Sequence, residues 1–353
     1  MKKHNFFAGP AILPEIVKKN AAKAALNYKN KGLSLLEMSH RSPEFTAIME
    51  DTESMVRELL NVPDDYAVLF LTGGASSQFF MAAMNLYAKK DIVGYLDTGT
   101  WSTKAIKEAK AFCDLKVLAS SGDKNYTYIP RGYKIPSKMK YVHVTSNNTI
   151  FGTQLKSFPK TDKLLITDMS SDIFSRRIKV SDHALIFAGA QKNAGPAGVT
   201  LVIVKKSLLG KNKKTLPTML DYRTHIAKNS SFNTPPVFPI YVMMLNLKWL
   251  KSKGGVKGME VRNKAKAKLI YDEIDNNPMF VGAAAKRDRS LMNVTFLMTD
   301  TSKEKSFLSK CKKAGIMGIK GHRSVGGFRA SIYNALELSS VKALVKVMKS
   351  MKA

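Results

Sequence analysis

Residues 164 to 204 read LLITDMSSDIFSRRIKVSDHALIFAGAQKNAGPAGVTLVIV and contain three apolar runs, at 164–167, 185–188 and 199–204. The runs are nearly continuous and rich in β-branched residues, which is typical of strands buried on both faces of a largely parallel sheet. Asp168 ends the first run, and Lys192 follows the second in a loop of small residues. This stretch therefore predicts an α/β fold.

The same pattern recurs over the first two thirds of the chain. Further strands are predicted at 67–71, 92–96 and 141–145, with amphipathic helical patterns between them. Repeated alternation of strand and helix favours a layered α/β domain.

The pattern changes near Gly254-Gly255. Beyond it the chain predicts a long helix, a strand at 292–298, a helix at 303–314, short strands and a last helix. One apolar stripe marks that last helix, formed by Val341, Leu344, Val345 and Met348. We therefore predict a large α/β domain over residues 14–255. A smaller α+β domain is predicted over 256–353, joined by the N-terminal segment 1–13.

The composition limits the class of protein. Hydrophobic residues make up 44% of the 353 residues and charged residues 24%, which excludes a wholly disordered chain. The apolar runs are far shorter than the ~20 residues of a membrane-spanning helix. No secretory signal is recognisable at the N-terminus. Cys113 and Cys311 lack any paired spacing that would indicate a disulfide framework or a metal site. We expect a cytoplasmic protein with no membrane partner and no metal.

The net charge of +30 has two interpretations. Lys and Arg in this number are typical of a nucleic-acid-binding protein, because neutralising phosphates drives such binding. The cations are spread along the chain, however, and this favours a solvated surface that attracts anions broadly. We expect no specific nucleic-acid partner.

A glycine turn is the first segment that could carry chemistry. Residues 67–78 run from a strand through Gly73-Gly74 and small hydroxyl residues into a helix. Glycines let the backbone approach a ligand closely, and N–H groups at a helix N-terminus attract phosphate. An ordinary strand–helix turn is the alternative, because neither the Walker pattern nor Gly-x-Gly-x-x-Gly is present.

Asp168 and Lys192 are the other candidates. Asp168 stands where open α/β sheets bind their ligands, or else caps a helix. Lys192 is either a surface lysine or a desolvated amine of lowered pKa, suited to forming a Schiff base. The two residues are 24 positions apart, about one strand–turn–strand excursion.

Together these features are what a pyridoxal-phosphate enzyme requires. The lysine would hold the cofactor aldehyde as an imine. The aspartate would keep the pyridine nitrogen protonated, so that the ring accepts electrons from a substrate carbanion. Trp101 follows the strand at 92–96, and its indole is placed to stack on the ring, whereas Trp249 lies in a predicted helix and is expected in the core.

A family resemblance makes this interpretation specific. Six motifs, in order along the chain, resemble the phosphoserine aminotransferases, which are class V aminotransferases of the fold-type I pyridoxal-phosphate group: Phe7-Ala8-Gly9-Pro10, Ser39-His40-Arg41-Ser42, Thr98-Gly99-Thr100-Trp101, Ala188-Gly189-Ala190-Gln191-Lys192-Asn193, Phe232-Asn233-Thr234-Pro235-Pro236 and the run from Gly321 to Arg329. The resemblance implies a mostly parallel seven-stranded sheet in the large domain plus the smaller α+β domain.

The resemblance also implies a role for each matched residue. Lys192 would be the catalytic residue that holds the cofactor, Asp168 would pair with the pyridinium, and Trp101 would stack on the ring. Further cofactor contacts would come from Ala75, Ser76, Thr149 and Gln191. Asn233 and Thr234 would reach the cofactor phosphate of the neighbouring subunit, so the resemblance implies a homodimer with shared active sites.

Substrate binding is implied for five basic residues. Arg41 would bind the carboxylate of the amino acid. The substrate's carboxylate and phosphate would be surrounded by His40, His322, Arg323 and Arg329. Guanidinium groups suit this task because they bind carboxylate and phosphate bidentately.

The implied reaction transfers the amino group of L-glutamate to 3-phosphohydroxypyruvate, in serine biosynthesis. By the same resemblance the related four-carbon phosphooxy-oxobutanoate of pyridoxine biosynthesis is a second acceptor. The alternatives are another class V transaminase or lyase, and a basic nucleic-acid-binding protein on this fold. Two features depart from the family: the run from Thr72 to Ser77 offers mainly backbone and hydroxyl groups to a phosphate, and the charge is far more positive.

Overall fold

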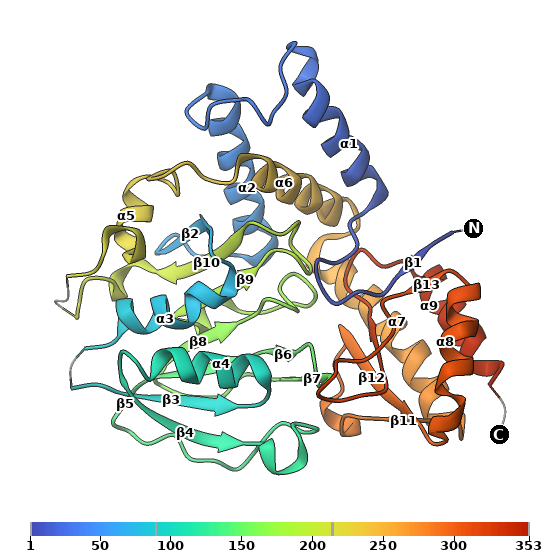
Figure 1. The fold of residues 1–353 in the computed structure, drawn as a ribbon. Coiled ribbons are helices and arrows are strands. Elements are labelled where there is room, and N and C mark those ends of the chain that lie inside the picture. Colours follow the sequence, from blue (N-terminus) through green and yellow to red (C-terminus); the bar gives the residue numbers. More distant parts are fainter. Residues whose placement is uncertain (1, 89, 213–214, 352–353) are drawn as a thin grey trace.

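A seven-stranded sheet forms the centre of the computed structural model, which describes residues 2–88, 90–212 and 215–351 (Figure 1). Its strands follow the order β2 (Tyr66–Leu71), β10 (Thr200–Lys205), β9 (Leu185–Gly189), β8 (Leu164–Asp168), β5 (Met139–Thr145), β3 (Ile92–Asp97) and β4 (Asp114–Ser120). Strand β10 runs antiparallel to both neighbours, and every other pair is parallel. The predicted mostly parallel seven-stranded sheet is confirmed.

Side chains on these strands alternate between two buried faces. On β2, Leu69 and Leu71 join one apolar cluster, whereas Val68 and Phe70 join another. The first face is covered by α3 (Gly74–Leu86), α4 (Thr100–Ala109) and α5 (Tyr222–Ala227), the second by α2 (Pro43–Leu60) and α6 (Val237–Ser252) (Figure 1). Because both faces are buried, the strands read as continuous apolar runs.

The edge strand β4 was not among the predicted strands. It reads Asp-Leu-Lys-Val-Leu-Ala-Ser, and none of its seven residues is fully buried. An edge strand covered incompletely by helices does not need an apolar run, so the pattern that marks the central strands is absent here.

A second group of elements lies C-terminal to the large sheet. Helices α7 (Gly255–Asn276), α8 (Glu304–Lys313) and α9 (Leu338–Lys349) pack on an antiparallel sheet of β11 (Phe280–Gly282), β12 (Asn293–Met298) and β14 (Phe328–Ser331). The predicted stripe on the last helix is confirmed, since Val341, Leu344, Val345 and Met348 are all buried.

The N-terminal segment packs with this second group. Strand β1 (His4–Asn5) pairs in parallel with β13 (Ile316–Met317), and Phe6 is fully buried in the same apolar cluster as α7, α8 and α9. At the start of α7, Val256 and Met259 belong instead to the cluster under α6. The helix thus contributes to both cores, and the division at residue 255 stays a prediction.

Short elements complete the fold. Helix α1 (Glu15–Leu26) packs on α6, and β6 (Asn147–Asn148) pairs with β7 (Thr153–Gln154). Turns of 3-10 helix lie at Tyr28–Asn30, Gly122–Lys124, Val180–Asp182, Lys206–Leu208, Thr218–Leu220, Lys286–Asp288 and Thr301–Lys303. Trp249, expected in the core, is half-buried at its edge. Within the described ranges, no helix has the length and apolar character needed to span a membrane.

Candidate active site

The carboxyl ends of β8 and β9 bring the two predicted residues together. These strands are parallel neighbours, with Asp168 opposite Phe187, so Asp168 and the loop that follows β9 emerge at one edge of the sheet. Asp168 and Lys192, 24 positions apart in the sequence, are thereby brought together by one strand crossover. The edge is the place where open α/β sheets bind ligands.

Lys192 lies on that loop with its amine largely surrounded by protein. The Nζ atom donates a hydrogen bond to Thr149 Oγ1 at 2.8 Å and lies 5.4 Å from the centroid of the Trp101 ring. Burial lowers the pKa of Lys192 to about 8, against the opposing charge of Asp168. The neutral, nucleophilic amine is therefore far more abundant near neutral pH than in an ordinary lysine.

Asp168 is buried, with 4% of its surface exposed, and no cation lies within ion-pair distance in the described residues. Its Oδ1 atom accepts hydrogen bonds from Ser170 N at 2.9 Å and from Ser170 Oγ at 2.6 Å. Burial raises its pKa, although both bonds and the charge of Lys192 favour the carboxylate. A buried carboxylate in this setting is stabilised by any cationic group that binds beside it.

Trp101 and Thr149 form the wall next to the lysine. Trp101 is the second residue of α4, and its buried Nε1 atom has no hydrogen-bond partner among the described residues. Thr149 is buried in the turn after β6. The two residues offer an aromatic plane and a hydroxyl on either side of the Lys192 amine.

Arg329 reaches the same place from β14. Its Nη1 atom is 3.5 Å from the carbonyl oxygen of Thr149, and its buried Nε atom has no partner. The other three arginines that are not exposed each pair with a carboxylate: Arg57 with Glu53, Arg176 with Asp172, and Arg289 with Asp275. Arg329 lacks such a partner in the described chain, so it is free to bind a carboxylate or phosphate of a ligand.

A network of amides, which the sequence did not reveal, fixes the loop after Lys192 to the second group of elements. Asn193 accepts a hydrogen bond from Asn334 N at 3.0 Å and donates to Ser171 O at 3.2 Å. Nearby, Asn293 donates to the hydroxyl of Tyr333, which in turn donates to Ala8 O. These hydrogen bonds fix the loop that carries Lys192 relative to the C-terminal group of elements that carries Arg329.

The glycine turn before α3 presents an open helix N-terminus. Gly73 and Gly74 have φ values of 89° and 67°, which favour glycine, and the helix then begins at once with Ala75 and Ser76 in its first turn. Ser76 is exposed, whereas Ser77 Oγ donates to Gly74 O at 2.9 Å. The first-turn N–H groups are thus available to an anion. Gln191, adjacent to Lys192, is half-buried at the sheet edge.

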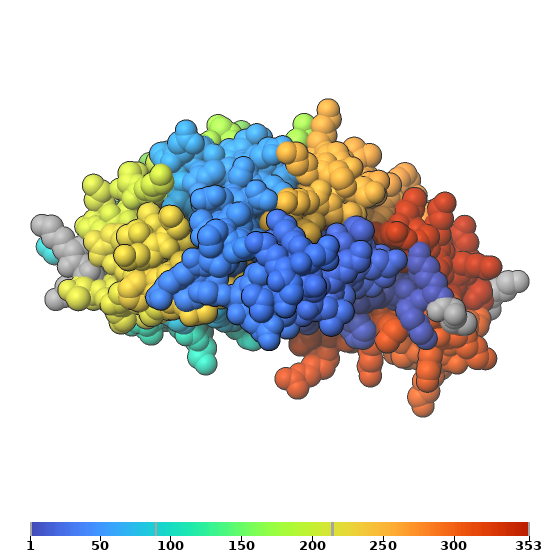
Figure 2. All heavy atoms as spheres, turned by 90° about the horizontal axis from the view of Figure 1, so that it is seen from above, coloured from blue at the N-terminus to red at the C-terminus, as the bar shows by residue number. Residues whose placement is uncertain are grey.

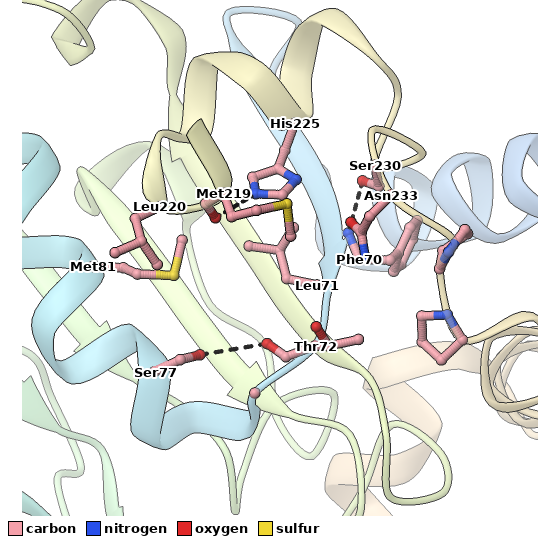
Figure 3. Close-up of a pocket in the computed structure, with 13 residues that line it drawn as sticks. Phe70, Leu71, Thr72, Ser77, Met81, Met219, Leu220, His225, Ser230 and Asn233 are labelled. Carbon is pink, nitrogen blue, oxygen red and sulfur yellow. Dashed lines mark hydrogen bonds between the residues drawn. The ribbon is translucent and has the colours of Figure 1, made fainter. Parts of the chain in front are cut away.

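Figure 3 shows a cavity of about 200 Å³ beside this turn. Thr72 and Ser77 lie on one side of it, and Ser230 and Asn233 lie across from them. Asn233 and Thr234 are both exposed, and Asn233 Nδ2 donates a hydrogen bond to Thr234 O at 3.3 Å. Among the described residues, no hydrogen bond joins either of them to Lys192.

The remaining predicted residues are divided between two places. His322 and Arg323 lie in the loop before β14, and the positive charges of Arg329 and Arg323 contribute to the lowered pKa of His322 after burial. His40 and Arg41 shortly precede α2; Arg41 is exposed, and its backbone N–H donates to Ser39 Oγ. Among the described residues no contact joins His40 or Arg41 with Lys192.

No cluster of His, Cys, Asp and Glu in the described ranges is arranged to hold a metal ion. The groups at the sheet edge are instead an amine, a carboxylate, an aromatic plane, unpaired cations and free N–H groups. This set can hold an anionic aromatic aldehyde covalently and a second anion next to it.

Known proteins of the same chemistry match the whole chain. Residues 4–344 match the aminotransferase class-V family. A phosphoserine aminotransferase from Flavobacterium johnsoniae is 55% identical over 354 residues, with 100% of this chain and 99% of the relative covered. A phosphoserine aminotransferase from Bacteroides thetaiotaomicron is 53% identical, with 99% and 98% covered.

Solved structures agree. Phosphoserine aminotransferase from Bacillus circulans subsp. alkalophilus superposes with a TM-score of 0.95 at 44% identity, covering 99% of this chain and 98% of that one. The pyridoxal-phosphate-bound phosphoserine aminotransferase from Trichomonas vaginalis gives 0.94 at 37% identity, covering 99% and 100%. The chain belongs to the class V aminotransferases and, within them, to the phosphoserine aminotransferase family.

Proposed function

We propose that the protein transfers the amino group of L-glutamate to 3-phosphohydroxypyruvate, giving O-phospho-L-serine and 2-oxoglutarate, with pyridoxal phosphate as cofactor. The observation that carries the proposal is that Lys192, Asp168 and Arg329 lie together at one edge of the sheet. Among the described residues, Arg329 has no carboxylate as an ion-pair partner. An amine of lowered pKa, a buried carboxylate and an unpaired guanidinium are the groups that transamination of an anionic substrate needs.

The residues at the sheet edge fit the cofactor. The buried Asp168 would hold a proton on the pyridine nitrogen, and the partnerless Nε1 of Trp101 lies in a ring placed for stacking. Ala75, Ser76 and Gln191 would hold the phosphate at the N-terminus of α3, and Thr149 would complete the contacts. When bound, the cofactor supplies an electron sink for the negative charge that develops on the substrate carbon.

Lys192 would do the proton chemistry. Once its amine is released from the cofactor, it would move a proton between the substrate Cα and the cofactor C4′ as a general acid–base. Its lowered pKa suits both directions of that transfer near neutral pH. The Thr149 hydroxyl, 2.8 Å from Nζ, would keep the amine over the reacting atoms.

Basic side chains would select the substrates. Arg41 would bind the amino-acid carboxylate, and His40, His322, Arg323 and Arg329 would surround the carboxylate and the phosphate. Donor and acceptor would use one site in turn, which gives ping-pong kinetics. The four-carbon phosphooxy-oxobutanoate presents the same two anionic groups and would be a second acceptor.

We propose further that the active enzyme is a homodimer of cytoplasmic residence. Support comes from Asn233 and Thr234, which are exposed and form no hydrogen bond with Lys192 among the described residues. Leu26, Leu33 and Leu36 are 83%, 54% and 63% exposed on the N-terminal segment that spreads over the face in Figure 2. Exposed apolar side chains in this number are typical of an interface. A partner subunit would deliver Asn233 and Thr234 to the cofactor phosphate.

The test uses the purified holoenzyme and its Lys192→Ala variant, with Lys107→Ala as a control on an exposed lysine. We expect a visible absorption band in the wild type and the control that shifts when glutamate is added. The Lys192→Ala variant should lack both the covalent band and the shift. A variant that keeps the band and consumes glutamate would contradict the assignment.

A second experiment distinguishes this reaction from another class V activity. Alanine at His322 or Arg323 should reduce kcat/KM for 3-phosphohydroxypyruvate far more than it reduces kcat/KM for glutamate. Equal losses for both substrates would leave the transaminase chemistry in place and remove the substrate assignment.

A further inference from the structure

Lys104 and Lys192 approach the same aromatic ring, that of Trp101. Its Nζ atom lies 4.9 Å from the centroid of the Trp101 ring, and Lys192 Nζ lies 5.4 Å from the same centroid. Lys192 bonds to Thr149, whose carbonyl oxygen is 3.5 Å from Arg329. Three cations from α4, the loop after β9 and β14 therefore meet around one indole and one threonine.

The arrangement holds the exposed Lys104 beside Trp101. Residues three apart on a helix are neighbours, and a helical side chain points back toward the helix N-terminus, so the Lys104 stem lies over Trp101. The attraction between an ammonium and an indole face holds the charge there. Lys104 is exposed, so its ammonium remains accessible to a ligand entering from solvent.

The cations of this cluster have no anionic partner. Among the described residues, no carboxylate lies within 4.0 Å of Lys104, Lys192, Arg323 or Arg329. The positive charges of Arg329, Arg323 and Lys104 all contribute, after burial, to the lowered pKa of His322. Like charges gathered this closely repel one another, and a bound anion relieves that repulsion.

Resting on the proposed function, we propose that Lys104 binds the phosphate of the phosphorylated keto acid and sets the preference for phosphorylated over non-phosphorylated substrates. In a bound phosphorylated keto acid the phosphate would lie at the opposite end from the carbon on which Lys192 acts, where an exposed cation such as Lys104 could reach it. A phosphate carries close to two negative charges at pH 7 and gains more from an added ammonium than a single carboxylate does. Lys104 is thus a phosphate-binding residue of the acceptor half-reaction.

The experiment compares Lys104→Met with Lys107→Met in the holoenzyme. Lys107 is an exposed lysine one turn further along α4, so it matches Lys104 in charge and helix but does not contact Trp101. We expect Lys104→Met to lower kcat/KM for 3-phosphohydroxypyruvate about tenfold, since charge-assisted hydrogen bonds to a phosphate are strong. The rate of the glutamate half-reaction, followed by cofactor absorbance, should change less than about twofold. Lys104→Arg should recover most of the loss.

A second measurement does not depend on turnover of the proposed acceptor. Inorganic phosphate should inhibit the glutamate half-reaction of the wild type, and its inhibition constant should rise about tenfold in Lys104→Met but not in Lys107→Met. If the wild type binds phosphate in this way but does not use 3-phosphohydroxypyruvate, the proposed function fails and the phosphate site stands. Equal effects of the Lys104 and Lys107 substitutions in both measurements, or no phosphate inhibition of the wild type, would overturn the role of Lys104.

Discussion

The lowered pKa of Lys192 can be measured directly in protein freed of its cofactor. Only the neutral amine adds to an aldehyde, so the rate of pyridoxal phosphate capture should rise with pH and level off above about 8. A pKa of about 8 leaves ~10% of the amines neutral at pH 7, against ~0.03% for an ordinary lysine of pKa 10.5. Burial would thus accelerate capture roughly 300-fold at neutral pH through amine ionisation alone.

The charge of Asp168 provides the internal check. Its carboxylate favours the ammonium form and so raises the pKa of Lys192 against the larger effect of burial. In Asp168→Asn the inflection of the rate–pH curve should therefore move to lower pH. The capture rate is measured by stopped-flow absorbance between pH 6 and about 10.5, a range that spans the lowered and the ordinary lysine pKa.

The control is Lys192→Ala, in which cofactor binding should show no inflection near pH 8 and no covalent absorbance. An inflection close to 10.5 in the unaltered protein would refute the role of burial. A shift to higher pH in Asp168→Asn would refute the assigned influence of the carboxylate.

Three further perturbations test the site and its support. Arg329→Lys should raise KM for glutamate about tenfold or more in steady-state assays, because an ammonium cannot replace bidentate binding by a guanidinium; an unchanged KM would place the carboxylate elsewhere. Asn193→Ala should lower the free energy of unfolding by about 2 kcal/mol in urea titrations, since it leaves the N–H of Asn334 unpaired, and a loss below ~0.5 kcal/mol would contradict the amide network. Leu344→Ala should cost about 2–5 kcal/mol, whereas the exposed Lys346→Ala should stay within ~0.5 kcal/mol; similar values for the two would argue against the packing of α9.

The central strands could be predicted because burial on both faces leaves a strong mark in the sequence. Each predicted strand of the large sheet lies within two residues of its observed bounds, as β8 and β9 illustrate. The position of Asp168 and Lys192 at one edge followed from the same pattern, since parallel neighbours end on the same side. Strand β4 was not predicted because this edge strand, with Lys116 and the exposed Val117, has no continuous apolar run.

The hydrogen bonds that hold the site together could not be predicted from local pattern. Asn147 donates to Asn293 across 146 residues of sequence, and Asn193 meets Asn334 across 141. Such pairs have no periodicity and depend on where two separate cores meet. The same reasoning applies to Asn233 and Thr234, whose proposed contact is with the cofactor phosphate of another subunit and which no intrachain pattern could therefore reveal.

Charge alone does not distinguish a catalytic lysine from the other basic residues of this chain. The group that accepts a hydrogen bond from the amine does distinguish it. The buried Lys266 donates to the carbonyl oxygens of Ile332 and Tyr333, at 2.8 and 2.6 Å, and Lys156 donates to that of Arg289. Those amines are held by backbone carbonyl oxygens. Releasing the amines would leave these buried carbonyls without a hydrogen bond, at a cost of about 1–3 kcal/mol each. Lys192 instead donates to the hydroxyl of Thr149, which can rotate to another partner, so its amine can leave at little cost. A buried lysine whose hydrogen bond can be broken at a small cost in free energy is able to form a covalent bond instead. This property depends on the group that accepts the hydrogen bond and not on the lysine itself.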